Sequence, residues 1–136
     1  MATHTFPGRF ESLEKISEFV QKVARSASLS ERDVYAVQLA VDEACTNIIE
    51  HAYHGEGKGE IVCTCDVLRD GFKVVLLDRA SPFHPDKMPE PVLNAPLDEV
   101  KQRGLGIFLM CKMMDDVKFE QSPGGGNRLT MIKHRK

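Results

Sequence analysis

The sequence lacks several features that would each place it in a broad class of protein. Its 18 basic and 20 acidic residues give a formal net charge of −2, so it has no basic surplus of the kind that nucleic-acid-binding domains carry. No apolar run approaches the roughly 20 residues that a membrane-spanning helix needs. Residues 1–10 also lack the basic-then-apolar order of a signal peptide. We therefore expect a cytoplasmic protein that binds neither nucleic acid nor a membrane directly.

A complete metal or redox motif is also missing around the four cysteines, Cys45, Cys63, Cys65 and Cys111. Cys63 and Cys65 are separated by one residue in a strand-like run, which places them on the same face of a strand. They could form half of a metal site or a redox pair, but no second CxxC or pair of histidines completes a zinc set. We interpret them as small apolar residues that fill a core.

The 136 residues suffice for one hydrophobic core, and no internal repeat or linker is visible, so we predict a single domain over residues 1–136. Apolar residues recur at three- and four-residue steps after Ser12, which predicts a helix with Ser12 as its N-cap. A capping signal at Ser30 and Asp33 predicts a second helix over about 31–53. The apolar residues of this second helix cover an arc so wide that most of its circumference should be packed.

The remaining elements are mostly short strands joined by turns. Strands joined in this way must be antiparallel, and helices gathered on one face of such a sheet make a two-layer α/β sandwich of the α+β class. Residues 79–103 contain five prolines and little periodicity, which indicates a functional loop or lid. We predict strands over 3–10, 60–68, 72–77, 117–121 and 129–133, and a short helix over 107–114.

Three polar residues on the second helix need an explanation. Glu43 and Asn47 are four residues apart, so they share one helix face, and His51 follows one turn later. Such groups on a mostly buried helix are costly unless a ligand or partner satisfies them. A carboxylate can orient or deprotonate a nucleophile, and an asparagine oxygen is a suitable Mg²⁺ ligand. The spacing alone is common on solvated helix faces, so it requires support from elsewhere in the chain.

That support comes from three sites that follow the second helix in the sequence, and from the order in which they occur. Asp78 ends an apolar strand, where a carboxylate can accept hydrogen bonds from a ligand amino group or simply form a turn. Gly104, Leu105 and Gly106 come just before a predicted helix, where backbone N–H groups favour a phosphate. The glycine-rich turn at 124–127 precedes the last strand and is, by itself, an ordinary hairpin.

Two segments carry a resemblance to a known family. Val41–Tyr53 reads VDEACTNIIEHAY, and Arg103–Met110 reads RGLGIFLM. These segments resemble motifs of the ATP-binding domains shared by gyrase, the heat-shock chaperones, histidine kinases and mismatch-repair ATPases. The sequence is most similar to the anti-sigma-factor serine kinases of bacterial stress and sporulation switches, over nearly the whole chain. The resemblance implies the Bergerat, or histidine-kinase-like, ATPase fold, with ATP and Mg²⁺ as ligands.

The resemblance also implies roles for individual residues. Glu43 occupies the position of the catalytic base, and Asn47 that of the ligand to the Mg²⁺ that bridges the ATP phosphates. His51 would lie near the phosphates, and Asp78 would read the adenine amino group. The glycine motif implied to contact the phosphates comprises Arg103, Gly104, Leu105 and Gly106, and residues 79–103 would form the ATP lid.

Two positions depart from the family pattern. The adenine motif usually reads Asp-x-Gly, whereas here Ala80 replaces the glycine, and its methyl group would crowd or reshape the adenine pocket. The last motif often contains Gly-Thr, whereas here Asn127 follows Gly126. Asn127 can still form hydrogen bonds, so this change should matter less than the one at Ala80.

The resemblance implies a Mg-ATP-dependent protein serine/threonine kinase that acts as an anti-sigma regulator and phosphorylates an anti-anti-sigma (STAS-type) partner. Such a protein could also bind a sigma factor and form a homodimer. One alternative is a binding module that uses nucleotide state to choose its partners, with little kinase activity. Another is an interaction module that binds no nucleotide. Glu43 and Asn47 favour the kinase over the nucleotide-free module, whereas Ala80 favours the latter.

Overall fold

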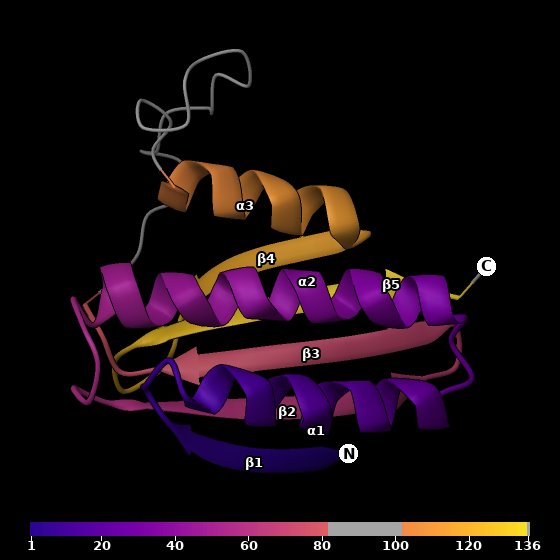
Figure 1. The fold of residues 1–136 in the computed structure, drawn as a ribbon, viewed down its shortest axis with the longest axis horizontal. Helices are drawn as coiled ribbons and strands as arrows, with labels where there is room; N and C mark the ends of the chain where they lie inside the picture. Colours follow the sequence, from indigo (N-terminus) through magenta and orange to yellow (C-terminus); the bar gives the residue numbers. More distant parts are fainter. Residues whose placement is uncertain (82–101, 136) are drawn as a thin grey trace.

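The computed structural model describes residues 1–81 and 102–135, which form one sheet and a layer of helices (Figure 1). The strands are β1 (Ala2–Pro7), β2 (Glu60–Leu68), β3 (Gly71–Asp78), β4 (Asp116–Gln121) and β5 (Asn127–His134). The helices are α1 (Ser12–Ser26), α2 (Glu31–Asn47) with a following π-helical turn (Ile48–Ala52), and α3 (Gln102–Met113).

The sheet has the strand order β1-β2-β3-β5-β4, and all four neighbouring pairs are antiparallel. Helices α1, α2 and α3 lie side by side over one face of it (Figure 1). The predicted two-layer sandwich is therefore confirmed. The pairing of β3 with β5 places the end of one strand directly beside the start of the other, with Asp78 opposite Asn127.

The hydrophobic core fills the space between the sheet and the helices. Alternate residues of β2 and β3 point towards the helices and are almost fully buried, among them Ile61, Phe72 and Leu76. Cys63 and Cys65 belong to the same buried face, which confirms that they pack as core residues. Their mutual hydrogen bond and their burial raise the pKa of the Cys63 thiol, which keeps it protonated and unreactive.

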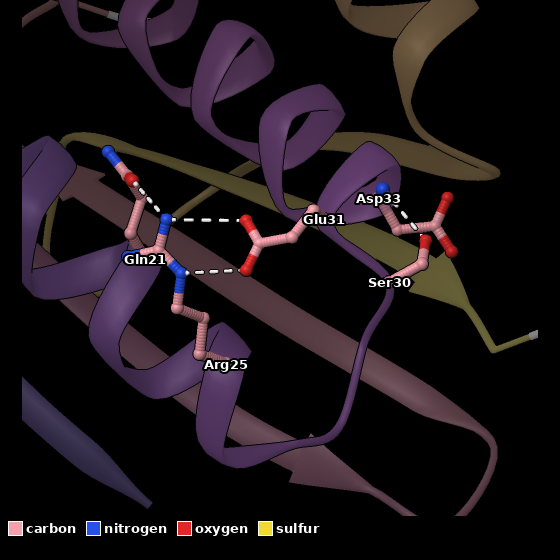
Figure 2. Close-up of polar contacts among 5 residues, drawn as sticks. All are labelled: Gln21, Arg25, Ser30, Glu31 and Asp33. Carbon is pink, nitrogen blue, oxygen red and sulfur yellow. Dashed lines mark hydrogen bonds and ion pairs between the residues drawn. The ribbon is translucent and has the colours of Figure 1, made fainter.

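The junction between α1 and α2 confirms one predicted cap and corrects another. The Ser30 hydroxyl accepts a hydrogen bond of 3.1 Å from Asp33 N, as the capping signal predicted (Figure 2). The Ser12 cap was wrong, because Ser12 is already inside α1 and its backbone N–H donates to Arg9 O at 2.9 Å. The N-cap position belongs to Glu11, whose side chain forms no capping hydrogen bond.

The predicted helix over 31–53 is α-helical only as far as Asn47. Tyr53 N donates to Ile48 O at 2.8 Å, a contact five residues apart that creates the π-helical turn. This turn is wider than an α-helical turn. His51 therefore does not continue the Glu43–Asn47 line with the regular spacing that the sequence suggested.

Several predicted boundaries need adjustment, and one prediction lies outside the description. Strands β3, β4 and β5 are each longer by one to three residues than predicted, and α3 begins five residues earlier. Most of the predicted lid, residues 82–101, lies outside the described residues. Within the described part of the chain, no helix is both long and apolar enough to cross a membrane.

Candidate functional site

A small open cavity of about 40 Å³ lies between α2, α3, β4 and the adjoining ends of β3 and β5. It brings together three of the predicted site residues, Asn47, Asp78 and Asn127. The polar groups thus converge in a mostly apolar pocket, as is usual for small-molecule sites. The apolar wall includes residues that the sequence did not single out for a site: Ala44, Ile48, Ala52, Ile107, Met110, Phe119 and Leu129.

The end of the site near Glu43 depends on a close approach of α3 to α2. A Cβ atom added to Gly106 would lie 3.0 Å from Glu43 Oε2 and 3.1 Å from Asn47 Nδ2. Glycine at position 106 therefore allows α3 to approach these two polar side chains closely. Glu43 and Asn47 lie on one face of α2, as their spacing predicted.

The Asn47 amide is suited to a ligand. Its Nδ2 atom is buried and has no hydrogen-bond partner within the described residues. An unsatisfied buried polar group costs about 1–3 kcal/mol, so a protein seldom retains one without a function. A half-turn of the amide about its last bond would present the oxygen in place of the nitrogen.

The donor chemistry at Asn47 fits magnesium better than a transition metal. No cluster of three or more His, Cys, Asp or Glu side chains that could hold a metal occurs among residues 1–81 and 102–135. Mg²⁺ does not need such a cluster, because it usually keeps waters and is completed by substrate phosphates around one or two protein oxygens. Asn47, with the Glu43 carboxylate close by, can supply that small set.

His51 lies apart from the cavity. Its Nε2 atom is 3.6 Å from the carboxylate of its neighbour Glu50, and it is absent from the cavity wall. The structure therefore brings Asn47, Asp78 and Asn127 together but does not bring His51 to the same pocket. The predicted contact of His51 with phosphates stays a prediction.

The opposite end of the cavity is formed by Asp78 and Asn127. Asp78 is only 6% exposed, and its Oδ1 atom accepts a 2.9 Å hydrogen bond from Asn127 Nδ2. Gly126 allows this approach, since its φ is +88° and an added Cβ would lie 2.0 Å from Asp78 O. Asn127 at the position where the family often has threonine thus contacts the predicted adenine-reading carboxylate directly.

Ala80 is accommodated in the turn that follows Asp78. Its backbone N–H donates to Asp78 Oδ1 at 2.9 Å, and its half-buried side chain packs against the core. The turn is therefore closed by a local hydrogen bond from an alanine at the position where the family usually has glycine.

The predicted glycine motif is placed differently from the expectation. Gly104, Leu105 and Gly106 lie inside α3, which starts at Gln102, rather than in a loop before it. The first N–H groups of any α-helix have no acceptor within the helix, and in α3 they include those of residues 102–104. The helix start can thus still offer N–H groups to a phosphate. The side chains of Arg103 and Leu105 lie outside the described part.

Asp42 is a residue that the sequence reasoning missed. Burial, with a smaller contribution from the neighbouring charge of Glu43, raises the pKa of Asp42 to about 6. Its side chain faces a groove between α1 and α2, together with Glu14 and Glu18. The sequence feature that could have drawn attention to Asp42 is its position directly before Glu43 in the segment Val41–Tyr53.

The fold and this site define a nucleotide-binding ATPase domain, and comparison with known families agrees. The chain belongs to the histidine kinase-like ATPase domain family, whose sequence profile matches residues 6–133. Among solved structures, its fold is similar to the RsbU and RsbW domains of Rv1364c from Mycobacterium tuberculosis. That match has a TM-score of 0.66 at 11% identity, over 99% of this chain and 32% of the other. The catalytic domain of histidine kinase ThkA matches with a TM-score of 0.58 at 14% identity, over 99% and 98% of the two chains.

Curated relatives narrow the similarity to one kind of protein. The chain is 33% identical over 96 residues to the serine-protein kinase RsbW of Bacillus velezensis, which is 68% of this chain and 60% of that protein. It is 28% identical over 122 residues to the serine-protein kinase RsbW of Bacillus cereus (strain ATCC 10987 / NRS 248), covering 87% and 76%. The chain thus spans about three fifths to three quarters of the length of these relatives.

Proposed function

We propose that this protein is a Mg-ATP-dependent serine/threonine-protein kinase that acts as an anti-sigma regulator and phosphorylates an anti-anti-sigma partner. The observation that carries the proposal is the convergence of Asn47, Asp78 and Asn127 on one cavity, with the Glu43 carboxylate near Asn47 where α3 approaches α2 at Gly106. The similarity to RsbW serine-protein kinases supports a protein hydroxyl, rather than water, as the phosphoryl acceptor.

In the proposed mechanism, one end of the site binds the adenine base and the other end binds the phosphates and the acceptor hydroxyl. Asp78, held by Asn127, accepts a hydrogen bond from the amino group of the adenine base. The apolar cavity wall then encloses the base and excludes water from it. Glu43 orients or deprotonates the serine or threonine hydroxyl of the partner, and the N–H groups at the start of α3 bind phosphate oxygens.

Asn47 would hold the magnesium ion, as its unsatisfied buried amide suggests. Bound Mg²⁺ neutralises phosphate charge and orients the phosphates for transfer. Because Gly106 has no side chain, α3 approaches Asn47 and Glu43 closely, and both of these side chains lie on the same side of α2.

A partner-binding module with little kinase activity is the second candidate. Glu43 supports the kinase, because a carboxylate beside the metal position can act as a base on an acceptor hydroxyl. The proposed partners are a STAS-type acceptor and a sigma factor, the proposed assembly is a homodimer, and the proposed location is the cytoplasm.

Nucleotide binding can be tested by calorimetry with ATP in the presence and absence of Mg²⁺. The wild type should bind Mg-ATP, and Asn47→Ala should remove the gain in affinity that Mg²⁺ provides. Gln38→Ala, on the same helix but in the groove towards α1, is the matched control and should bind as the wild type does. Absence of Mg-ATP binding by the wild type would refute both nucleotide-dependent functions.

Phosphoryl transfer can be tested with radiolabelled ATP and a purified STAS-type acceptor. Glu43→Gln should lower the transfer rate by at least about 100-fold, in the range expected for loss of a general base, while ATP binding persists. Glu31→Gln, at the far end of α2, is the control. Unchanged transfer by the Glu43 variant would show that the base assignment is wrong, and no transfer by the wild type would favour the binding module.

A further inference from the structure

Tyr53 ends the segment Val41–Tyr53, which carries the family resemblance, and has no role in the site described so far. Its side chain is buried, and its ring lies against Gly59, where an added Cβ would come within 2.3 Å of the ring. The Tyr53 hydroxyl donates to Glu60 O at 2.7 Å and accepts from Arg79 N at 2.9 Å. One phenol therefore connects the end of the π-helical turn, the start of β2 and the residue that follows Asp78.

The next two residues after Arg79 are held as well. Ala80 N donates to Asp78 Oδ1, and Ser81 O accepts from Asn127 Nδ2, both at 2.9 Å. Asn127 Nδ2 also donates to Asp78 Oδ1 at 2.9 Å. A primary amide has two N–H bonds, and Asn127 uses both, one for each acceptor. The three residues of the turn are thus fixed at three separate points.

We propose that Tyr53 is a positioning residue for the nucleotide base. It acts through the backbone of Arg79 to fix the turn that aims the Asp78 carboxylate into the cavity, and Asn127 is the second anchor of that turn. This inference rests on the proposed nucleotide site and adds a residue to which no role in that site has been given.

The physical reason is the narrow geometry of a hydrogen bond. A carboxylate selects a base amino group only while the donor–acceptor distance stays near 2.9 Å, and the interaction weakens steeply when the angle is lost. Asp78 is the last residue of β3, so the strand continues from it only towards the N-terminus, and the residues that follow it are not held by the sheet. Tyr53 and Asn127 instead hold the residues on the C-terminal side of Asp78, through hydrogen bonds to Arg79 and Ser81.

The decisive variant is Tyr53→Phe, which removes only the hydroxyl. Its matched control is Tyr35→Phe, because Tyr35 is the other tyrosine of the chain and is 59% exposed on α2. The probes are Mg-ATP and the Mg complex of purine riboside triphosphate, which differs from ATP only in lacking the amino group of the base. Dissociation constants are measured by calorimetry at a temperature where all variants are folded.

We expect Tyr53→Phe to weaken Mg-ATP binding about five- to tenfold, the value of one lost hydrogen bond, and to leave purine riboside triphosphate binding within twofold of the wild type. The selectivity for the amino group should therefore fall by about the same factor, whereas Tyr35→Phe should keep it. A general loss of folded protein would weaken both ligands equally, so the ratio separates positioning from stability.

A second variant tests the other anchor without touching Tyr53. Asn127→Thr offers a single hydroxyl hydrogen, so it can serve Asp78 or Ser81 but not both, and it should also reduce the selectivity. Unchanged selectivity in Tyr53→Phe, or an equal loss for both ligands, would overturn the inference while the proposed function stands. If the wild type bound neither triphosphate, both would be refuted.

Discussion

At the scale of single residues, Asp42 is an ionisable side chain whose negative charge is unfavourable in the folded protein. Its half-buried carboxylate lies beside Glu43 and opposite Glu14 and Glu18 of α1. Because its pKa is raised to about 6 in the folded protein, the folded state holds a proton more tightly than the unfolded chain, whose ordinary value is near 3.8. The free energy of unfolding must therefore fall as the pH rises from about 4 to about 6, and this loss persists above pH 6.

Asp42→Asn should remove this penalty. At pH 7.5 we expect the variant to be more stable than the wild type by about 1 kcal/mol, less than the full pKa shift implies, because solvent screens a half-exposed group. Near pH 3.5 the two proteins should be equally stable, since both are then uncharged at this position. Urea denaturation at both pH values measures the difference, with Asp70→Asn in the exposed turn before β3 as the control. A stabilisation that did not depend on pH would contradict the explanation.

At the scale of elements, Gly106 in the contact between α3 and α2 lowers the stability of α3 but leaves space for the polar side chains of the site. A glycine in a helix costs about 1 kcal/mol relative to alanine, yet Gly106 lies where a methyl group would touch Glu43 Oε2 and Asn47 Nδ2. Both of these atoms are at the ends of side chains, which can move aside. The helix therefore tolerates an alanine better than the site does.

Gly106→Ala should accordingly keep or raise the melting temperature while it weakens Mg-ATP binding at least severalfold. Cys111→Ala is a suitable control, because Cys111 is exposed and lies five residues further along the same helix. Thermal unfolding and calorimetry on the same samples give both quantities. A Gly106→Ala variant that bound Mg-ATP as well as the wild type would show that this close approach does not matter for the site.

The start of α2 depends on a local cap. Ser30 accepts the hydrogen bond from Asp33 N, while Arg25 of α1 forms a 3.2 Å ion pair with Glu31 across the junction (Figure 2). Exposed ion pairs contribute little, whereas an N-cap is worth about 1 kcal/mol. The serine should therefore matter more to the helix than the more conspicuous charge pair.

Ser30→Ala should reduce the free energy of unfolding by about 1 kcal/mol, and Arg25→Gln by less than half of that. Urea denaturation would reveal the order of the two effects. High salt should abolish the effect of Arg25→Gln but not that of Ser30→Ala, because only the ion pair is screened. The reverse order would show that the junction depends on charge.

At the scale of the whole molecule, nucleotide binding should raise the free energy of unfolding. A ligand that binds only the folded state at 100 times its dissociation constant adds about 2.7 kcal/mol. For a chain of this size, that corresponds to an increase of several degrees in the melting temperature. The cavity between α2, α3 and the sheet spans both layers, so ligand binding should stabilise the molecule as one unit.

We expect Mg-ATP to raise the melting temperature of the wild type, and ATP with a chelator to raise it less. Asn47→Ala should show the same small increase with and without Mg²⁺, because it lacks the proposed metal ligand. Differential scanning calorimetry measures both. Equal increases for the wild type with and without Mg²⁺ would argue against a metal at Asn47.

The sequence by itself determined the elements whose signals are local. The cap at Ser30, the antiparallel hairpins and the shared face of Glu43 and Asn47 follow from spacing and turn chemistry between near neighbours, and the described structure contains all of them. Local signals could not find the π-helical turn or the true start of α3. Tyr53 and Gly106, in these two elements, lie close to residues far away in the chain, and local patterns carry no information on such contacts.

Only the tertiary structure decided which polar groups meet. Asp78 and Asn127 are 49 residues apart, and they come into contact because the end of β3 pairs with the start of β5. Tyr53 reaches Arg79 for a similar reason, across 26 residues. Sequence spacing places each side chain on a face, but β3 and β5 are not joined by a turn, so the contacts between them depend on how the sheet and helices pack together.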